Sequence, residues 1–206
     1  MGFQNVGSVW DVPTFRSFVA SQSLGWASGV CLHHTASPSL EQRPRGFTIQ
    51  HMRNLENFYK NELGWSAGPH LFIDDDQIFG LSSLEEKGVH ARSFNATHIG
   101  IEVLGDYDSE DPLSGRGLQC WETAAKATSI LLDALGKSEN AVAFHREDPK
   151  TSKTCPGEKV TKSWFLSLLA NNSDDRSDAP AENRSVEVSK SLDAIEWQVQ
   201  KLRKLL

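Results

Sequence analysis

The stretch His98-Ile-Gly-Ile-Glu-Val-Leu-Gly105 is the clearest β-strand of the chain, and the rest of the fold has to be arranged around it. Side chains alternate between the two faces of a strand, so Gly100 and Glu102 share one face. The residues on the other face are all large and apolar, which is typical of a strand buried in a core. This apolar face consists of Ile99, Ile101 and Val103.

Further strands and helices are predicted on both sides of this strand. Apolar runs with turn residues at their ends predict strands at residues 29–34, 70–74, 77–80 and 141–144. The strands at 70–74 and 77–80 are expected to form a hairpin that turns at Asp75 and Asp76. Helical periodicity predicts a short helix within residues 1–27 and longer helices over residues 49–62, 118–135 and 158–170. Strands interleaved with helices predict an α/β fold, a central mixed β-sheet flanked by helices.

The ends of two of these helices carry recognisable signals. Thr48 precedes the second helix as an N-cap, and Gly64 follows it as a stop. The long helix over residues 118–135 is followed by Gly136, which can adopt the left-handed conformation that ends many helices.

The composition of the chain changes at Asn171. Residues 1–170 are expected to form one domain, residues 171–185 a polar, acidic linker, and residues 186–206 an amphipathic helix. The apolar residues of the last segment follow the a/d heptad spacing of a coiled coil, but for less than three heptads, so the helix needs a partner to be stable. Self-association, docking to another protein, or packing against the domain would each provide one. The stripe consists of Val188, Leu192, Ile195, Val199, Leu202 and Leu206.

Charge and composition exclude several classes of protein. The net charge of −6 and the absence of Lys/Arg runs argue against nucleic-acid binding. No apolar run approaches the length of about 20 residues that a membrane span needs. The first residues lack a positive segment followed by an apolar one, so synthesis in the cytoplasm without a signal peptide is expected. Three cysteines in such a chain argue against a disulfide framework.

The stretch His145-Arg-Glu-Asp-Pro-Lys-Thr-Ser-Lys-Thr-Cys-Pro-Gly157 offers an imidazole and a thiol ten residues apart. A loop must fold back if both are to contact one metal ion, as a hydrolytic zinc site requires, with a third ligand from elsewhere. His33, at the end of a predicted strand, is a candidate for that ligand, although strand parity near an end does not separate it from His34. Taken singly, His145 as a loop histidine and Cys155 as a buried structural thiol are the commoner interpretations.

Four motifs together resemble the zinc N-acetylmuramoyl-L-alanine amidases, which include phage lysozyme-type amidases, bacterial recycling amidases and peptidoglycan-recognition proteins. The resemblance covers about residues 28–170, and the motifs follow the order of the family. They are Cys31-Leu-His-His-Thr-Ala36, Gly68-Pro-His-Leu-Phe-Ile73, the strand at 98–105, and His145 with Lys153-Thr-Cys-Pro156. Any one motif is weak, whereas four in order are specific.

The resemblance implies a Zn²⁺ ion in a surface cleft, held by His33, His145 and Cys155. It also implies that Glu102 is the catalytic carboxylate that deprotonates water and protonates the leaving amine. Lys153 matches the lysine that stabilises the oxyanion of the transition state. The alternative without a catalytic role is, for Glu102, a solvent-exposed charge at a strand end. For Lys153 it is an ordinary surface lysine.

Other positions depart from the family or match it less specifically. Pro69 stands where many phage members have a tyrosine, which leaves the base role to Glu102. His90 and Asn95 resemble the groove segment that meets the muramyl peptide, and His70 matches a recurrent family position. Substrate contact and a structural role remain open for these three residues. The other histidines are expected to be structural; they are His34, His51 and His98.

The implied function is that of a zinc-dependent peptidoglycan hydrolase. It would cut the amide between the lactyl group of N-acetylmuramic acid and L-alanine of the stem peptide, in peptidoglycan or a muropeptide. The added linker and helix favour a phage or prophage endolysin, which acts on the cell wall after release from the cytoplasm. The alternatives are a cytosolic recycling amidase for anhydro-muropeptides, a toxin delivered by a secretion machine, and a recognition protein that binds peptidoglycan without cutting it. Cys155 argues against the last, since non-catalytic members typically lose this ligand.

Overall fold

A computed structural model describes residues 2–174 of the chain, with side chains up to Asn171. Within these residues one six-stranded sheet has the strand order β1-β4-β3-β5-β2-β6. The strands are β1 (Val9–Trp10), β2 (Gly29–His34), β3 (Leu71–Ile73), β4 (Ile78–Gly80), β5 (His98–Val103) and β6 (Val142–Phe144). β3, β5, β2 and β6 are parallel to one another, whereas β4 is antiparallel to β3 and β1 is antiparallel to β4. The prediction of an α/β fold with a central mixed sheet is confirmed.

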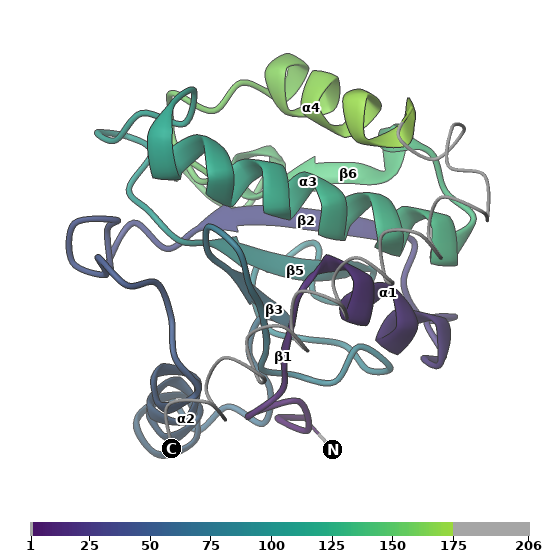
Figure 1. The fold of residues 1–206 in the computed structure, drawn as a ribbon. Coiled ribbons are helices and arrows are strands. Elements are labelled where there is room, and N and C mark those ends of the chain that lie inside the picture. The colour runs from purple at the N-terminus through teal and green to yellow at the C-terminus, as the bar shows by residue number, and fades with distance from the viewer. Residues whose placement is uncertain (1, 175–206) are drawn as a thin grey trace, which may run out of the picture. The chain divides into compact units, whose positions relative to one another are not determined.

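Helices flank the sheet (Figure 1). They are α1 (Val12–Ala20), α2 (Ile49–Asn57), α3 (Gly115–Leu135) and α4 (Lys162–Asp174), with a π-helical turn η1 (Phe58–Glu62) after α2 and 3₁₀ turns η2 (Glu139–Ala141) and η3 (His145–Glu147) on either side of β6. α3 crosses one face of the sheet beside α1, in front of β2 and β5 in Figure 1. On the face turned away from α3, Ala91 and Phe94 pack against Cys31 of β2 and Ala143 of β6.

The side chains of β5 alternate between the two faces of the sheet as the sequence predicts. Ile99, Ile101 and Val103 are fully buried in the core shared with α3. Because successive side chains of a strand point to opposite faces, Gly100 and Glu102 lie on the other face. Glu102 keeps 16% of its side chain exposed there, as expected for a group that lines a cleft.

Local signals also set the helix ends. The Thr48 side chain accepts a hydrogen bond from the His51 N–H and so caps α2. Gly136 ends α3 in the left-handed region, at φ 62°. The predicted helix over residues 49–62 is α-helical only to Asn57 and continues as the π-turn η1.

Two elements, β1 and α4, differ from the sequence prediction. The two-residue strand β1 was not predicted, because so short a segment carries no periodicity. α4 begins at Lys162 and continues to Asp174, four residues into the segment for which a linker was predicted. The rest of that segment and the predicted helix over residues 186–206 lie outside the described residues. Among the helices of the described part, none is long and apolar enough to cross a lipid bilayer.

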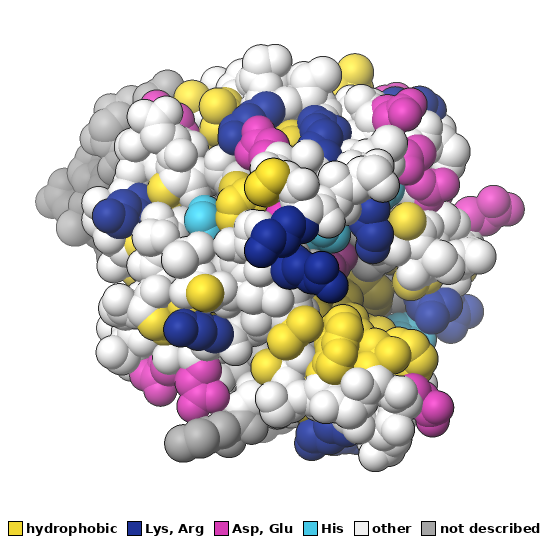
Figure 2. Space-filling model, turned by 180° about the vertical axis from the view of Figure 1, so that it is seen from behind, with side chains coloured by type: hydrophobic (Ala, Val, Ile, Leu, Met, Phe, Trp, Pro, Cys, Tyr) yellow, Lys and Arg dark blue, Asp and Glu magenta, His cyan; other side chains and the backbone are white. Residues whose placement is uncertain are grey.

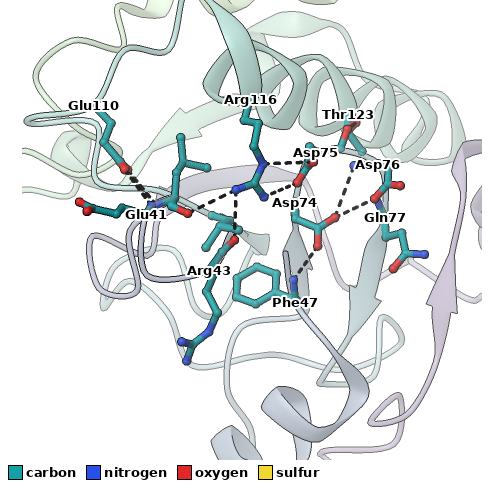
Figure 3. Close-up of polar contacts among 12 residues, drawn as sticks. Glu41, Arg43, Phe47, Asp74, Asp75, Asp76, Gln77, Glu110, Arg116 and Thr123 are labelled. Carbon is teal, nitrogen blue, oxygen red and sulfur yellow. Dashed lines mark hydrogen bonds and ion pairs between the residues drawn. The ribbon is translucent and has the colours of Figure 1, made fainter. Parts of the chain in front are cut away.

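A polar network holds the loop between β2 and α2 (Figure 3). The guanidinium group of Arg116 donates to both carboxylate oxygens of Asp75 and to the carbonyls of Leu40 and Arg43. The Glu110 carboxylate accepts from the backbone N–H of Leu40. The loop backbone is thus fastened to α3 and to the loop before it.

Asp74 fixes the end of the same loop. Its buried carboxylate accepts hydrogen bonds from the N–H groups of Phe47 at 2.7 Å and Gln77 at 3.0 Å. Because residues 35–38 and Phe47 line the cleft described below, the Arg116 and Asp74 contacts together position one wall of that cleft.

Replacing Arg116 with alanine is expected to lower the free energy of unfolding by about 2 kcal/mol, the range for hydrogen bonds to a charged group. Urea denaturation measures this loss. Arg16→Ala is the matched control, since Arg16 contacts Asp133 at 3.9 Å with both side chains about half exposed, and such pairs contribute less than about 1 kcal/mol. Equal losses in the two variants would contradict the role given to Arg116.

Candidate active site

Three polar side chains lie in a row at the carboxyl ends of three adjacent parallel strands. His33 on β2 is the register partner of Glu102 on β5. Leu32 on β2 pairs with Phe144, the last residue of β6, so His145 follows directly on the other side of β2. Ligand sites in α/β proteins commonly form at this edge of a sheet. The topology alone therefore brings Glu102, His33 and His145 together.

The loop after β6 folds back so that Cys155 joins this row. The Arg146 N–H donates to the Cys155 carbonyl at 2.8 Å. The Arg146 guanidinium also donates to the carbonyls of Thr154, Gly157 and Val160. An arginine has five N–H donors in a fixed fork, which suits it to hold several carbonyls of one turn. Arg146 therefore fixes the return of the loop next to the histidine that begins it.

The side chains of His33, His145 and Cys155 form a donor group that fits a zinc ion. Their ligand atoms all lie within 4.8 Å of one another. The Cys155 Sγ is 3.7 Å from the His33 Nδ1. In a tetrahedral site, sulfur at about 2.3 Å and nitrogen at about 2.0–2.1 Å from zinc are about 3.6 Å apart. Two imidazoles and a thiol with this spacing match the chemistry of a three-ligand zinc site.

A second group of donors overlaps the first, made up of Cys31, His33 and His90. Here the His33 Nε2 and His90 Nδ1 are 3.0 Å apart, a normal hydrogen-bond length. Two nitrogens on a tetrahedral zinc ion would be about 3.3 Å apart. Cys31 is fully buried and does not line the cleft, whereas His145 and Cys155 do. The geometry favours the first group as the metal site.

Glu102 lies directly beside these donors. Its Oε1 is 3.7 Å from the His33 Nδ1. Burial raises the pKa of Glu102 to about 8, and Lys153 acts in the opposite direction. A carboxylate whose pKa is close to neutral can both accept and donate a proton at physiological pH, which is what a general base that later acts as an acid must do.

Burial also determines the protonation of the donors. It lowers the pKa of His33 well below its usual value, and it lowers that of His145, with Lys153 contributing to both. Burial, followed by Glu102, raises the pKa of the Cys155 thiol. Both imidazoles are thus neutral at pH 7, which is the form that coordinates a metal. A bound cation would stabilise the thiolate form of Cys155.

These groups open into a cleft of about 570 Å³. Figure 2 shows the molecule from this side, with histidine visible in the hollow, Lys and Arg side chains along one rim and a hydrophobic patch along the other. Lys153 is exposed and lines the cleft from the returning loop. Thr154 lines it from the same loop, and the lining residues on other segments include His34, Thr35, Pro38, Phe47, Leu55, Tyr59, Phe72, His90 and Asp108.

Of the three residues expected to contact substrate, only His90 lines the cleft, whereas Asn95 and His70 do not. His90 lines the cleft, behind His33. Asn95 does not line it; its Oδ1 accepts the N–H groups of His90 at 2.7 Å and Ala91 at 2.9 Å, and so shapes the turn that carries His90. His70 is fully buried below the cleft, where its ring stacks on Trp26.

The two ring nitrogens of His70 are both used inside the protein. Nδ1 accepts from the Gly100 N–H at 2.9 Å, and Nε2 lies 3.0 Å from the Glu86 carbonyl, to which it must donate. This neutral ring therefore holds β5 at Gly100, two residues before Glu102. Two of the remaining histidines also have partners: the His34 Nδ1 accepts from the Tyr107 N–H, and the His98 ring contacts Thr97. The Nδ1 of His51 is buried without a hydrogen-bond partner among the described residues.

The buried ring of His70 makes stability depend on pH. Burial lowers the pKa of His70 to about 4, whereas an unfolded chain has a histidine pKa of about 6.5. Between these values the unfolded chain binds more protons, so the free energy of unfolding falls as the pH decreases from about 6.5 to about 4. The contribution of His70 to this loss is about 3 kcal/mol.

Urea denaturation across this pH range, on the wild type and His70→Asn, tests this expectation. Asparagine keeps an acceptor for the Gly100 N–H but does not titrate. Above pH 6.5 the wild type is expected to have the larger free energy of unfolding. The difference in this free energy between wild type and variant should shrink by about 3 kcal/mol towards pH 4. A difference that stays constant with pH would contradict the assignment.

Sequence reasoning missed three side chains of this region. Arg146 clamps the returning loop, and its position directly after a candidate ligand was the available signal. The buried Asp148 carboxylate accepts from the Ser93 N–H at 2.8 Å and ties this loop to the segment that carries His90. Tyr59, on η1, lines the cleft, and burial raises its pKa. Contacts between distant segments carry no local sequence pattern.

Comparison with known proteins identifies related chains. The sequence model of the N-acetylmuramoyl-L-alanine amidase family matches residues 25–158, more than half of the chain. The peptidoglycan-recognition protein SC2 of Drosophila simulans is 26% identical over 152 residues, which cover 70% of this chain and 77% of that protein. The family resemblance inferred from the four motifs is thereby confirmed.

Solved structures show the same fold. The N-acetylmuramoyl-L-alanine amidase LysC from Clostridium intestinale superposes with a TM-score of 0.54 at 20% identity, covering 70% of this chain and 86% of that chain. A mutant of Drosophila PGRP-LB in complex with tracheal cytotoxin superposes with a TM-score of 0.53 at 19% identity, covering 81% and 88%. One fold thus includes a chain named as an amidase and a chain named as a recognition protein.

Proposed function

The chain belongs to the N-acetylmuramoyl-L-alanine amidase family, and from this premise we propose that it is a zinc-dependent hydrolase of peptidoglycan. The bond cut is the amide between the lactyl group of N-acetylmuramic acid and L-alanine of the stem peptide. The observation that carries the proposal is the donor group of His33, His145 and Cys155 at the edge of an open cleft, with the Glu102 carboxylate 3.7 Å from His33.

In this proposal each residue has a defined role. His33, His145 and Cys155 would hold zinc, which would supply a Lewis acid to polarise the amide carbonyl and to lower the pKa of the attacking water. Glu102 accepts a proton from that water and gives it to the leaving amine of L-alanine as the C–N bond breaks. The Lys153 ammonium group stabilises the negative charge that develops on the carbonyl oxygen.

Mass spectrometry of digested sacculi tests this proposal most directly. The expected products are free stem peptides that begin with L-alanine and glycan strands that keep the lactyl carboxylate, one water being consumed for each bond. The same digestion of soluble anhydro-muropeptides separates a wall-degrading enzyme from a recycling enzyme. Cleavage between sugars, or between two amino acids of the stem, would overturn the assignment of the bond.

A second candidate function is the binding of peptidoglycan without hydrolysis. It is supported by the similarity to a protein named as a peptidoglycan-recognition protein and by the recognition protein solved with tracheal cytotoxin. Against it stands the complete donor group with Cys155. Sacculi that retain the zinc-loaded protein but release no peptide would favour this second function.

We further propose that the substrate is the intact cell wall and that the protein acts as an endolysin, reaching the wall after release from the cytoplasm. The similarity in fold to a protein named as an endolysine N-acetylmuramoyl-L-alanine amidase, LysCS from Clostridium intestinale, supports this role. Faster release of stem peptides from sacculi than from soluble muropeptides is the expected result. The reverse preference would favour a recycling enzyme.

A further inference from the structure

We propose that His90 is a positioning residue that fixes which nitrogen of His33 faces the metal site. The inference rests on the proposed function only in that it assigns a metal to His33, His145 and Cys155. Its structural basis is a relay of two imidazoles that ends on a backbone carbonyl. The His33 Nε2 contacts the His90 Nδ1 at 3.0 Å, and the His90 Nε2 contacts the His98 carbonyl at 3.0 Å.

The direction of each hydrogen bond follows from the carbonyl. A carbonyl oxygen only accepts, so the His90 Nε2 must carry the proton of that bond. In a neutral imidazole the other nitrogen is then an acceptor, so the His90 Nδ1 must receive its hydrogen bond from His33. The proton of His33 therefore sits on Nε2, and its Nδ1 keeps a free lone pair.

The surroundings of the His33 Nδ1 agree with this assignment. The nearest carboxylate oxygen, Glu102 Oε1, is 3.7 Å away, beyond hydrogen-bond length for an N–H donor. The Cys155 Sγ is at the same distance, within reach of a thiol that donates to a nitrogen lone pair. The His33 Nδ1 thus faces Cys155 and Glu102 with the lone pair that a metal ligand requires.

The His90 ring has little freedom to leave this position. Asn95 holds the backbone on which the ring stands, through the N–H groups of His90 and Ala91. The ring lies against Gly100 on β5, where an added Cβ would come within 2.5 Å of the imidazole. Gly100 is therefore the residue that lets the imidazole lie flat on the strand between His33 and the His98 carbonyl.

A ligand held by such a relay should bind its metal more tightly. Metal-bound histidines usually donate their second N–H to a protein acceptor, and losing that acceptor typically lowers metal affinity about 10–100-fold. In this protein the acceptor is a second imidazole rather than a carboxylate. The relay orients His33 without placing a negative charge behind the site.

Nitrogen-15 NMR of the metal-free protein tests the relay without any activity measurement. Long-range proton–nitrogen spectra distinguish imidazoles protonated on Nε2 from those protonated on Nδ1. At pH 7, both His33 and His90 are expected to be protonated on Nε2. A His33 ring protonated on Nδ1 in the wild type would overturn the proposal, whatever the protein binds or hydrolyses.

Three variants extend the test to metal binding, measured by competition with a zinc chelator. His90→Phe removes the acceptor and is expected to lower zinc affinity about 10–100-fold and to leave His33 without a fixed tautomer. His90→Asn places an amide oxygen near the position of Nδ1 and is expected to recover most of the affinity. Gly100→Ala displaces the ring and should resemble His90→Phe.

His98→Gln is the matched control, because the relay uses the carbonyl of this residue and not its ring, which contacts Thr97. It should keep wild-type affinity and the Nε2 proton on His33. Unchanged affinity in His90→Phe, or equal losses in His90→Phe and His90→Asn, would overturn the positioning role. If the wild type binds no zinc, the proposed function fails, while the NMR result still decides the relay.

Discussion

Replacing Cys155 with alanine is expected to remove bound zinc and hydrolysis together. Cys155 supplies the thiol of the donor group, and its Sγ lies at the distance from His33 that a shared zinc ion requires. Loss of an outer-shell partner already lowers metal affinity about 10–100-fold. Loss of a ligand should therefore lower it by more than about 100-fold. Metal analysis of the purified variant and release of stem peptides from sacculi measure both effects.

Two matched variants make this prediction specific. Cys155→Asp offers a carboxylate, which is also a zinc ligand, and should keep part of the affinity. Cys31→Ala removes the thiol of the alternative donor group and should keep stoichiometric zinc. Loss of zinc in Cys31→Ala but not in Cys155→Ala would show that the metal binds behind His33, and the proposed site would be wrong.

Replacing Glu102 with glutamine should lower the rate of hydrolysis by about 10²–10⁴-fold, the usual contribution of a general acid–base group. The amide has nearly the shape of the carboxylate but does not accept a proton at neutral pH. Zinc content is expected to stay unchanged, because the donor group does not include Glu102. The ratio of kcat between variant and wild type, with zinc content determined on the same samples, gives the result.

Glu122→Gln is the control for this substitution. Glu122 lies on α3 and is not among the residues that line the cleft. It should leave both kcat and zinc content at wild-type values. Full activity in Glu102→Gln would mean that another group moves the proton, with Tyr59 as the next side chain of the cleft to vary.

The sequence predicted much of the sheet because strand periodicity is a local property. Alternation along residues 98–103 assigned Glu102 to the face opposite the buried isoleucines, and the structure agrees. The same alternation puts Cys31 and His33 on one face of β2. Both belong to the second group of donors, together with His90, and His33 also belongs to the group that fits zinc. A residue pattern that repeats every second position is readable without knowing the neighbouring strands.

Register and loop contacts could not be predicted in this way. The pairing of His33 with Glu102 depends on how β2 and β5 align, which residues far apart in the chain decide together. The hydrogen bond from His33 to His90 joins residues 57 positions apart, through a loop with no periodic pattern. His90 and Asn95 were therefore recognisable from the sequence as a motif but not as the support of a ligand.

The spread of the donor group along the chain links metal binding to folding. His33 and Cys155 are 122 residues apart in sequence, and the sheet has to form before their side chains meet. An unfolded chain consequently has no preformed zinc site, so zinc binds the native state preferentially and raises the free energy of unfolding with its concentration. Thermal denaturation with and without a chelator would then report on assembly of β5, β2 and β6, even with no substrate present.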